Sequence, residues 1–131
     1  GERSTGEYLA EYLDRGLPVS QLTMSSDGGG CLPTFDNEGV MVKMGIGSSG
    51  TLLQGIRQAR DLGAPLEKLL ATCTLNAASL FRFKGRGQLA AGNIADVVVC
   101  SQELKVEATI AEGHFLVRNF EPVVRGFFED R

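Results

Sequence analysis

Residues 19–28 read Val-Ser-Gln-Leu-Thr-Met-Ser-Ser-Asp-Gly, and this stretch decides the fold that the sequence predicts. Its first six residues form a run that is typical of a strand, and Asp27 follows at the start of a glycine-rich loop. In α/β folds, the side chains that carry chemistry lie at the carboxyl ends of strands. We therefore predict a strand over residues 19–24. It would bring the Asp27 carboxylate to a site where it can ligate a metal or exchange a proton.

The composition fits a protein with about one ordinary hydrophobic core. The chain has 131 residues, of which 43% are hydrophobic, and a formal net charge of −3. No apolar run reaches the roughly 20 residues that span a bilayer, and no basic segment followed by an apolar one opens the chain. Lys and Arg are not clustered, which argues against nucleic acid as a partner. We expect a cytoplasmic protein that binds neither membranes nor nucleic acid.

Helix signals lie on both sides of the opening stretch. A capping box at Ser4 and Glu7 predicts a first helix that ends at Gly16. Apolar residues at helical spacing predict further helices over residues 51–63, 65–73 and 74–83. The glycine-rich loop over residues 28–50 contains a short apolar piece that indicates a small hairpin, and loops of this length are usually functional.

The periodicity changes after residue 84, where alternating and apolar runs replace the helical spacing. Strands are expected at residues 95–100, 106–110, 114–117 and 123–124, with a turn at Glu112 and Gly113. The sequence thus predicts an α/β part over residues 1–83 and a small β unit over residues 84–131.

The cysteines and the histidine do not form a metal-binding or disulfide pattern. Cys31, Cys73 and Cys100 lie far apart, without the C-x-x-C spacing of zinc ribbons. We expect Cys73 and Cys100 to be small buried apolar residues. Cys31, in the loop after Asp27, either lines a pocket or has no role. His114 lies in a predicted strand and is expected to have an ordinary surface or packing role.

Several short segments are more specific together than alone. They are Ser-Ser-Asp-Gly at 25–28, the long glycine loop, Thr-Leu-Asn-Ala-Ala at 74–78, Lys-Gly at 84–85 and Gly-Asn-Ile-Ala-Asp-Val-Val-Val at 92–99. In this order they resemble the carboxyl-terminal part of the amidohydrolase superfamily. Within that superfamily they are most similar to the isoaspartyl (β-aspartyl) dipeptidase family. The resemblance extends from about Gly6 to about Gly126.

This resemblance implies a particular α/β fold class. Residues 1–83 would supply the last strand, active-site loop and helices of a (β/α)8 metal-dependent hydrolase barrel, and residues 84–131 the carboxyl-terminal half of a small β-sandwich domain. The earlier barrel strands, with the family's histidine and bridging lysine ligands, are absent, so the chain by itself is expected to be inactive. Missing neighbours on either side of residues 19–24 would leave unpaired strand edges and exposed apolar surface, and a homo-oligomer is expected.

The resemblance also implies the chemistry and the site residues. Asp27 would ligate one zinc ion of a binuclear site and serve as general base and acid for a metal-activated hydroxide that hydrolyses β-aspartyl dipeptides. Cys31 stands where close relatives have a serine that contacts the substrate, and a thiol is a weaker hydrogen-bond donor than a hydroxyl. Lys84 matches the Lys-Gly entry to the sandwich, not the metal-bridging lysine. Asp96 is expected to bond a neighbouring turn before a buried strand.

A second motif permits a different interpretation. Residues 45–50 read Gly-Ile-Gly-Ser-Ser-Gly, which matches the G-x-G-x-x-G of dinucleotide-binding loops. That fingerprint requires a second parallel strand about 20 residues later, and residues 65–70 there are predicted to be helical. The alternative is that these glycines shape a loop beside a barrel mouth.

Three functions from different classes remain open at this point. One is a metal-dependent peptidase that acts on β-aspartyl dipeptides. Another is a related amidohydrolase with a different substrate, such as a dihydroorotase-like enzyme or another cyclic amide or amide hydrolase. The third is a non-catalytic domain that acts by association.

Overall fold

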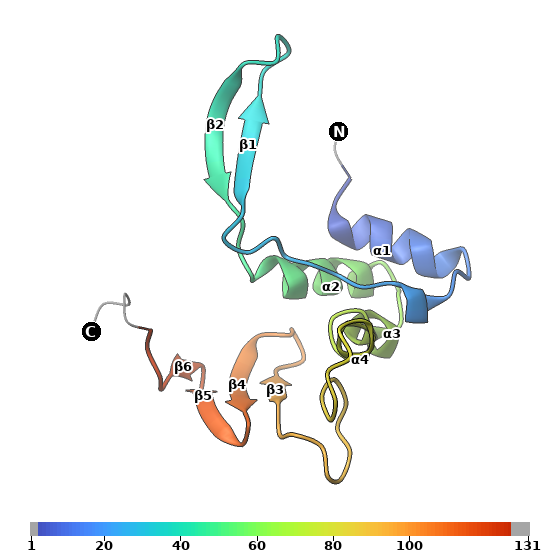
Figure 1. Cartoon of the computed structure of the whole chain (residues 1–131). Coiled ribbons are helices and arrows are strands. Elements are labelled where there is room, and N and C mark those ends of the chain that lie inside the picture. The colour runs from blue at the N-terminus through green and yellow to red at the C-terminus, as the bar shows by residue number, and fades with distance from the viewer. Residues whose placement is uncertain (1–2, 127–131) are drawn as a thin grey trace. The chain divides into compact units, whose positions relative to one another are not determined.

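The computed structural model describes residues 3–126. The chain divides into two compact units, Gly1–Cys73 and Thr74–Arg131. Figure 1 labels the elements of both units. No helix within the described residues is long and apolar enough to cross a membrane. The predicted boundary between a barrel part, residues 1–83, and a sandwich part, residues 84–131, stays a prediction.

The first helix, α1 (Thr5–Asp14), begins with the predicted capping box. The Ser4 hydroxyl accepts a hydrogen bond from the Glu7 backbone N–H at 3.3 Å, and the Glu7 carboxylate accepts one from the Ser4 backbone at 2.6 Å. These bonds satisfy two of the N–H groups that a helix start leaves unpaired. The hydrogen bond from the Ser4 backbone N–H is also the main reason why the pKa of Glu7 is lowered.

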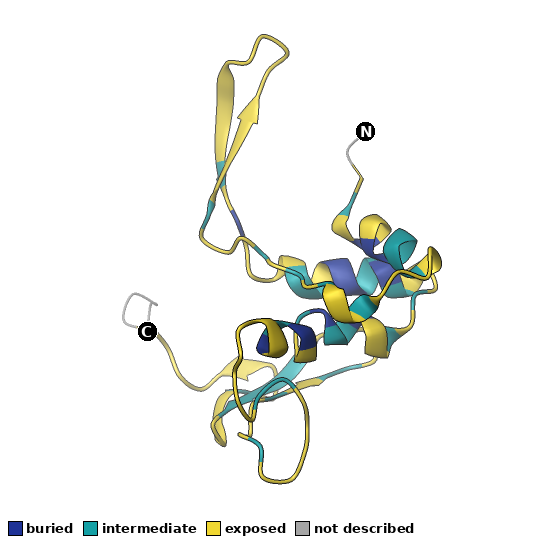
Figure 2. Ribbon diagram, turned by 45° about the vertical axis from the view of Figure 1, so that its right-hand side comes forward, coloured by how far each residue is buried: buried dark blue, intermediate teal, exposed yellow. Residues whose placement is uncertain are grey.

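The core of the first unit forms where α2 (Thr51–Asp61) packs against α1 on one side and α3 (Leu66–Ala71) on another. Glycine makes the α1–α2 crossing close, because a β-carbon on Gly6 would overlap the side chain of Gln58. The buried apolar side chains of this unit are those of Leu9, Ile56, Ala59 and Leu69. Figure 2 shows that burial is concentrated on these helices.

The strand predicted over residues 19–24 is wrong. Val19–Gln21 forms a short 3-10 helix, η1, in which the Leu22 backbone N–H bonds the Val19 carbonyl at 3.0 Å. The chain is extended only from Leu22, and Met24 donates a single bond to the Thr72 carbonyl at 3.2 Å. A β-strand is defined by its hydrogen bonds to a neighbouring strand, and no described strand pairs with this segment. The extended backbone that begins at Leu22 therefore has no ladder partner within residues 3–126.

The predicted hairpin is confirmed in the loop after Asp27. It consists of antiparallel strands β1 (Cys31–Phe35) and β2 (Met41–Ile46). At its tip, the Asp36 carboxylate accepts 2.9 Å hydrogen bonds from the backbone of Glu38 and Val40. The hairpin exposes large apolar side chains, namely Leu32, Phe35, Val40, Met41, Val42, Met44 and Ile46. Figure 2 shows both strands of the hairpin as mostly exposed. This apolar surface lies on the hairpin and not beside residues 19–24, where the sequence analysis expects it.

The second unit begins with α4 (Leu75–Leu80), which ends three residues before the predicted limit. A four-stranded antiparallel sheet follows, in the order β3 (Val97–Cys100), β4 (Val106–Ala111), β5 (His114–Arg118) and β6 (Glu121–Pro122). Three of the four predicted strands are confirmed.

The strand predicted at residues 123–124 is misplaced. The two residues after β5, Asn119 and Phe120, both have positive φ, 52° and 67°. This tight turn brings Glu121 directly opposite Arg118, so pairing starts two residues earlier than the apolar pattern indicates.

Asp96 bonds a neighbouring turn, as predicted. Its Oδ1 atom accepts a 2.9 Å hydrogen bond from the backbone N–H of Glu112, in the turn between β4 and β5. Its Oδ2 atom pairs with the guanidinium of Arg86, which also pairs with the Glu112 carboxylate. The Glu112 hydrogen bond and the Arg86 charge lower the pKa of Asp96, because both favour its ionised form.

Candidate active site

Asp27 lies in a turn formed by residues 27–30, here called the Asp27 turn. The Gly30 backbone N–H bonds the Asp27 carbonyl at 2.9 Å. Asp27 has a φ of 48°, a left-handed conformation that aspartate tolerates better than most residues. Before the turn, the hydroxyls of Ser25 and Ser26 accept hydrogen bonds from the backbones of Asp27 and Gly28 at 3.4 and 3.2 Å. The Ser-Ser-Asp-Gly segment therefore stabilises its own bend.

The base of the hairpin holds the Asp27 turn in place. Gly29 donates a 2.9 Å hydrogen bond to the Gly47 carbonyl, and Gly47 donates one of equal length to the Gly30 carbonyl. Gly47 is buried, and a β-carbon there would overlap the Asp27 carbonyl oxygen. Glycine at position 47 thus permits this close approach.

The carboxylate of Asp27 is exposed and, within residues 3–126, takes part in no hydrogen bond or ion pair. It lies over Gly30, where a β-carbon would stand 2.5 Å from Oδ1 and 2.7 Å from Oδ2. An unpaired carboxylate held on a fixed turn has the lone pairs to ligate a cation or to exchange a proton with bound water.

Cys31 is the first residue of β1, directly after the Asp27 turn. It is exposed, and its backbone pairs with Ile46 across the hairpin. Three glycines alone separate it from Asp27 in sequence. The fold therefore brings the two predicted site residues to the two ends of one turn.

Further metal ligands do not accompany Asp27 in the described part of the chain. Within residues 3–126, no group of three or more His, Cys, Asp or Glu side chains could hold a metal ion. His114 is exposed in β5, which agrees with the surface role predicted for it. Asp27 is thus a single candidate ligand, and a metal site would need ligands from outside these residues.

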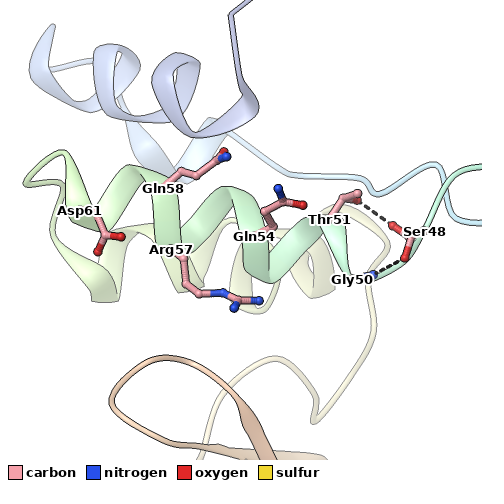
Figure 3. Close-up of a pocket in the computed structure, with 7 residues that line it drawn as sticks. All are labelled: Ser48, Gly50, Thr51, Gln54, Arg57, Gln58 and Asp61. Carbon is pink, nitrogen blue, oxygen red and sulfur yellow. Dashed lines mark hydrogen bonds between the residues drawn. The ribbon is translucent and has the colours of Figure 1, made fainter.

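A hollow lies along α2, next to the loop that joins the hairpin to this helix (Figure 3). Polar residues line most of it, namely Ser48, Gly50, Thr51, Gln54, Arg57, Gln58 and Asp61. The Thr51 hydroxyl donates a 2.8 Å hydrogen bond to the Ser48 carbonyl and fixes the start of the helix. Neither Asp27 nor Cys31 lines this hollow, so it is separate from the predicted site.

The glycine motif at residues 45–50 does not have the surroundings of a dinucleotide-binding loop. It begins in the last two residues of β2, whose partner β1 is antiparallel, and ends just before α2. The region where the fingerprint needs a second parallel strand forms α3. The contact between Gly47 and Asp27 instead supports the alternative, in which these glycines shape a loop.

Sequence reasoning did not connect Gly30 or Gly47 with Asp27, although both contact it in the fold. The available signals were the glycine run at residues 28–30 and the glycine motif at residues 45–50. An isolated run of glycine indicates a close approach but does not say which group comes close.

Comparison with known proteins identifies the family. The model of the amidohydrolase family matches residues 4–121, which is most of the chain. The chain belongs to the amidohydrolase family. This amidohydrolase chain is also 31% identical over 80 residues to adenine deaminase 2 of Carboxydothermus hydrogenoformans, a match that covers 60% of the chain and 14% of that protein.

Among solved structures, the amidohydrolase chain resembles β-aspartyl dipeptidases from Fervidobacterium islandicum AW-1. One of them, in complex with the β-Asp-Leu dipeptide, matches with a TM-score of 0.84 and 31% identity over 95% of this chain. The other matches with a TM-score of 0.77 and 26% identity over 97% of this chain. The predicted resemblance to isoaspartyl dipeptidases is therefore confirmed.

The chain spans about a third of these structures, since the two matches cover 32% and 31% of their chains. It is a mixed α/β part of the amidohydrolase fold that matches a portion of larger proteins.

Proposed function

We propose that this chain is part of a metal-dependent peptidase that hydrolyses β-aspartyl dipeptides. The observation that carries the proposal is the likeness to a β-aspartyl dipeptidase solved with β-Asp-Leu, which extends over 95% of this chain. The exposed, unpaired carboxylate of Asp27, held on a fixed turn, supports the same conclusion because such chemistry needs an accessible acid or base.

In this proposal, Asp27 holds one metal ion and moves a proton at a carboxylate oxygen. Two zinc ions, which the amidohydrolase resemblance implies, would supply a water of lowered pKa and polarise the scissile carbonyl. Asp27 fits this role because its oxygens have no partner within residues 3–126. After taking the proton from water, the same carboxylate would deliver it to the leaving amine.

Cys31 is proposed to contact the substrate. Its place directly after the Asp27 turn, on the exposed start of β1, would put a thiol beside the reacting carbonyl. A thiol is a weaker hydrogen-bond donor than the serine hydroxyl that the resemblance implies at this position. We therefore expect weaker substrate binding through this contact than a serine would provide.

We further propose that residues 1–83 form the last portion of a (β/α)8 barrel and residues 84–131 half of a small β-sandwich, in a cytoplasmic homo-oligomer. The missing barrel strands would then bring the remaining zinc ligands. For this reason the 131 residues alone are expected to have no hydrolase activity.

A second candidate is an amidohydrolase that acts on a different substrate. The observation in its favour is the match to an adenine deaminase, which covers 60% of this chain at 31% identity. Adenine and cyclic amides therefore belong in the substrate panel beside β-Asp-Leu.

The test measures zinc content and turnover of this panel with the full-length gene product that contains these residues. Zinc-dependent hydrolysis of β-Asp-Leu that falls by several orders of magnitude in Asp27→Asn would support the proposal. Zinc-dependent turnover of adenine or a cyclic amide, without dipeptide hydrolysis, would favour the second candidate. Dipeptide hydrolysis that Asp27→Asn leaves unchanged would exclude Asp27 from the mechanism.

A further inference from the structure

We infer that Gly30 is a positioning residue for the Asp27 carboxylate, and this inference rests on the proposed function. The bare α-carbon of Gly30 leaves the space in which that carboxylate lies. A β-carbon at position 30 would stand 2.5 Å from Oδ1 and 2.7 Å from both Cγ and Oδ2 of Asp27. All three atoms belong to the Asp27 carboxylate, which is the group proposed to act in catalysis.

Backbone conformation does not explain glycine at position 30. Gly29 and Gly39 have φ values of 82° and 80°, in the left-handed region where side chains are strained. Gly30 is not among the residues with positive φ. Its backbone conformation therefore does not require glycine, and the group that a β-carbon would meet at this position is the Asp27 carboxylate.

The two glycines that contact Asp27 touch different parts of it. At Gly47 the neighbouring atom is the Asp27 carbonyl oxygen, which belongs to the backbone and cannot move without the turn. At Gly30 the neighbouring atoms are at the end of a side chain that can rotate about χ1. A methyl group at position 30 would therefore turn the carboxylate away and leave the fold intact.

Displacing the Asp27 carboxylate by about an ångström should remove most of its contribution to kcat, since misplacements of that size can cost about 100-fold in rate. The Gly30→Ala variant should thus lower kcat for β-Asp-Leu by about 100-fold, with KM and melting temperature nearly unchanged. The matched control is Gly39→Ala at the hairpin tip, where φ is 80° and a β-carbon would meet no atom within 4 Å. It should lower the melting temperature and leave kcat unchanged.

The experiment uses the full-length gene product, with crystal structures of wild type and Gly30→Ala as a readout that does not depend on activity. The expected structure has a rotated Asp27 side chain on an unchanged turn. In the Asp27→Asn background, Gly30→Ala should have no further effect on kcat, because the group that it displaces is already disabled.

An Asp27 side chain in the same rotamer in both crystal structures would overturn the inference, whatever the substrate proves to be. So would a kcat within twofold of wild type, or equal losses from Gly30→Ala in both backgrounds. If wild type does not hydrolyse β-Asp-Leu but the rotamer changes as expected, the proposed function fails and the positioning role stands.

Discussion

The backbone of Gly47 lies directly against the carbonyl group of Asp27, so that a β-carbon at position 47 would overlap the carbonyl oxygen. Hydrogen bonds of 2.9 Å from Gly29 to Gly47 and from Gly47 to Gly30 close this contact on both sides. The base of the hairpin therefore holds the Asp27 turn in its conformation, and this depends on Gly47, 20 positions after Asp27 in the chain.

Gly47→Ala is expected to destabilise the chain by about 1–3 kcal/mol, since the added methyl group must push the Asp27 backbone aside. Urea unfolding followed by circular dichroism measures the change. The control is Gly50→Ala, because a β-carbon at Gly50 would meet only the Ser48 hydroxyl, at 3.5 Å. Equal stability of the two variants would show that the contact with Asp27 is not tight.

Ile56→Ala is expected to cost about 2–5 kcal/mol, because the Ile56 side chain is fully buried between the helices and its removal leaves a cavity. Leu62→Ala is the matched control, since Leu62 is 60% exposed just after the same helix. Its unfolding free energy should stay within about 0.5 kcal/mol of wild type. A small loss for Ile56→Ala would contradict the packing of α1, α2 and α3 described above.

The contact between Asp96 and Glu112 predicts a pH dependence of stability. The pKa of Asp96 is lower in the folded chain than its ordinary value, mainly because of the hydrogen bond from the Glu112 backbone N–H and then the charge of Arg86. A lowered folded pKa contributes stability above the unfolded pKa, which is about 3.9, and this contribution is lost as the pH falls through the folded value. Asp96→Asn should therefore be less stable than wild type near neutral pH, and the difference should shrink below about pH 4.

Thermal unfolding at several pH values checks this prediction. Glu121→Gln serves as the control, because Glu121 is exposed in β6 and its side chain has no described ion pair. A difference between Asp96→Asn and wild type that stays constant from neutral pH to about pH 3 would mean that the charge of Asp96 does not stabilise the turn.

Local signals in the sequence were sufficient for several elements. The capping box at Ser4 and Glu7 predicted the start of α1, and the turn at Glu112 and Gly113 predicted the β4–β5 hairpin. Asp96 was also expected to bond a turn. In the capping box and the hairpin, the interacting groups lie within a few residues of one another or follow a regular strand period, so short-range patterns contain the information. The turn that Asp96 bonds lies 16 residues later in the chain, and the sequence did not say which turn it would be.

Features that depend on distant partners could not be predicted. Residues 19–24 have the composition of a strand, but the chain forms η1 there and no described strand pairs with it. The contacts of Asp27 with Gly30 and Gly47 depend on how the hairpin folds back, which no local pattern specifies. Asp27 was expected at the carboxyl end of a strand that the structure does not form, and the residues that position its carboxylate were not identified.

Cys31 is expected to react with iodoacetamide before Cys73 at about pH 8, because Cys31 is exposed whereas burial raises the pKa of the Cys73 thiol. Peptide mapping by mass spectrometry measures the order of labelling.

In the full-length gene product, Cys31→Ser should lower KM for β-Asp-Leu, since a hydroxyl is the stronger hydrogen-bond donor, and alkylation of Cys31 should raise it. Alkylation should raise the KM of Cys73→Ser as much as it raises the KM of wild type, because Cys31 is present in both. Values of KM that neither the Cys31→Ser substitution nor alkylation changes would exclude a substrate contact for Cys31.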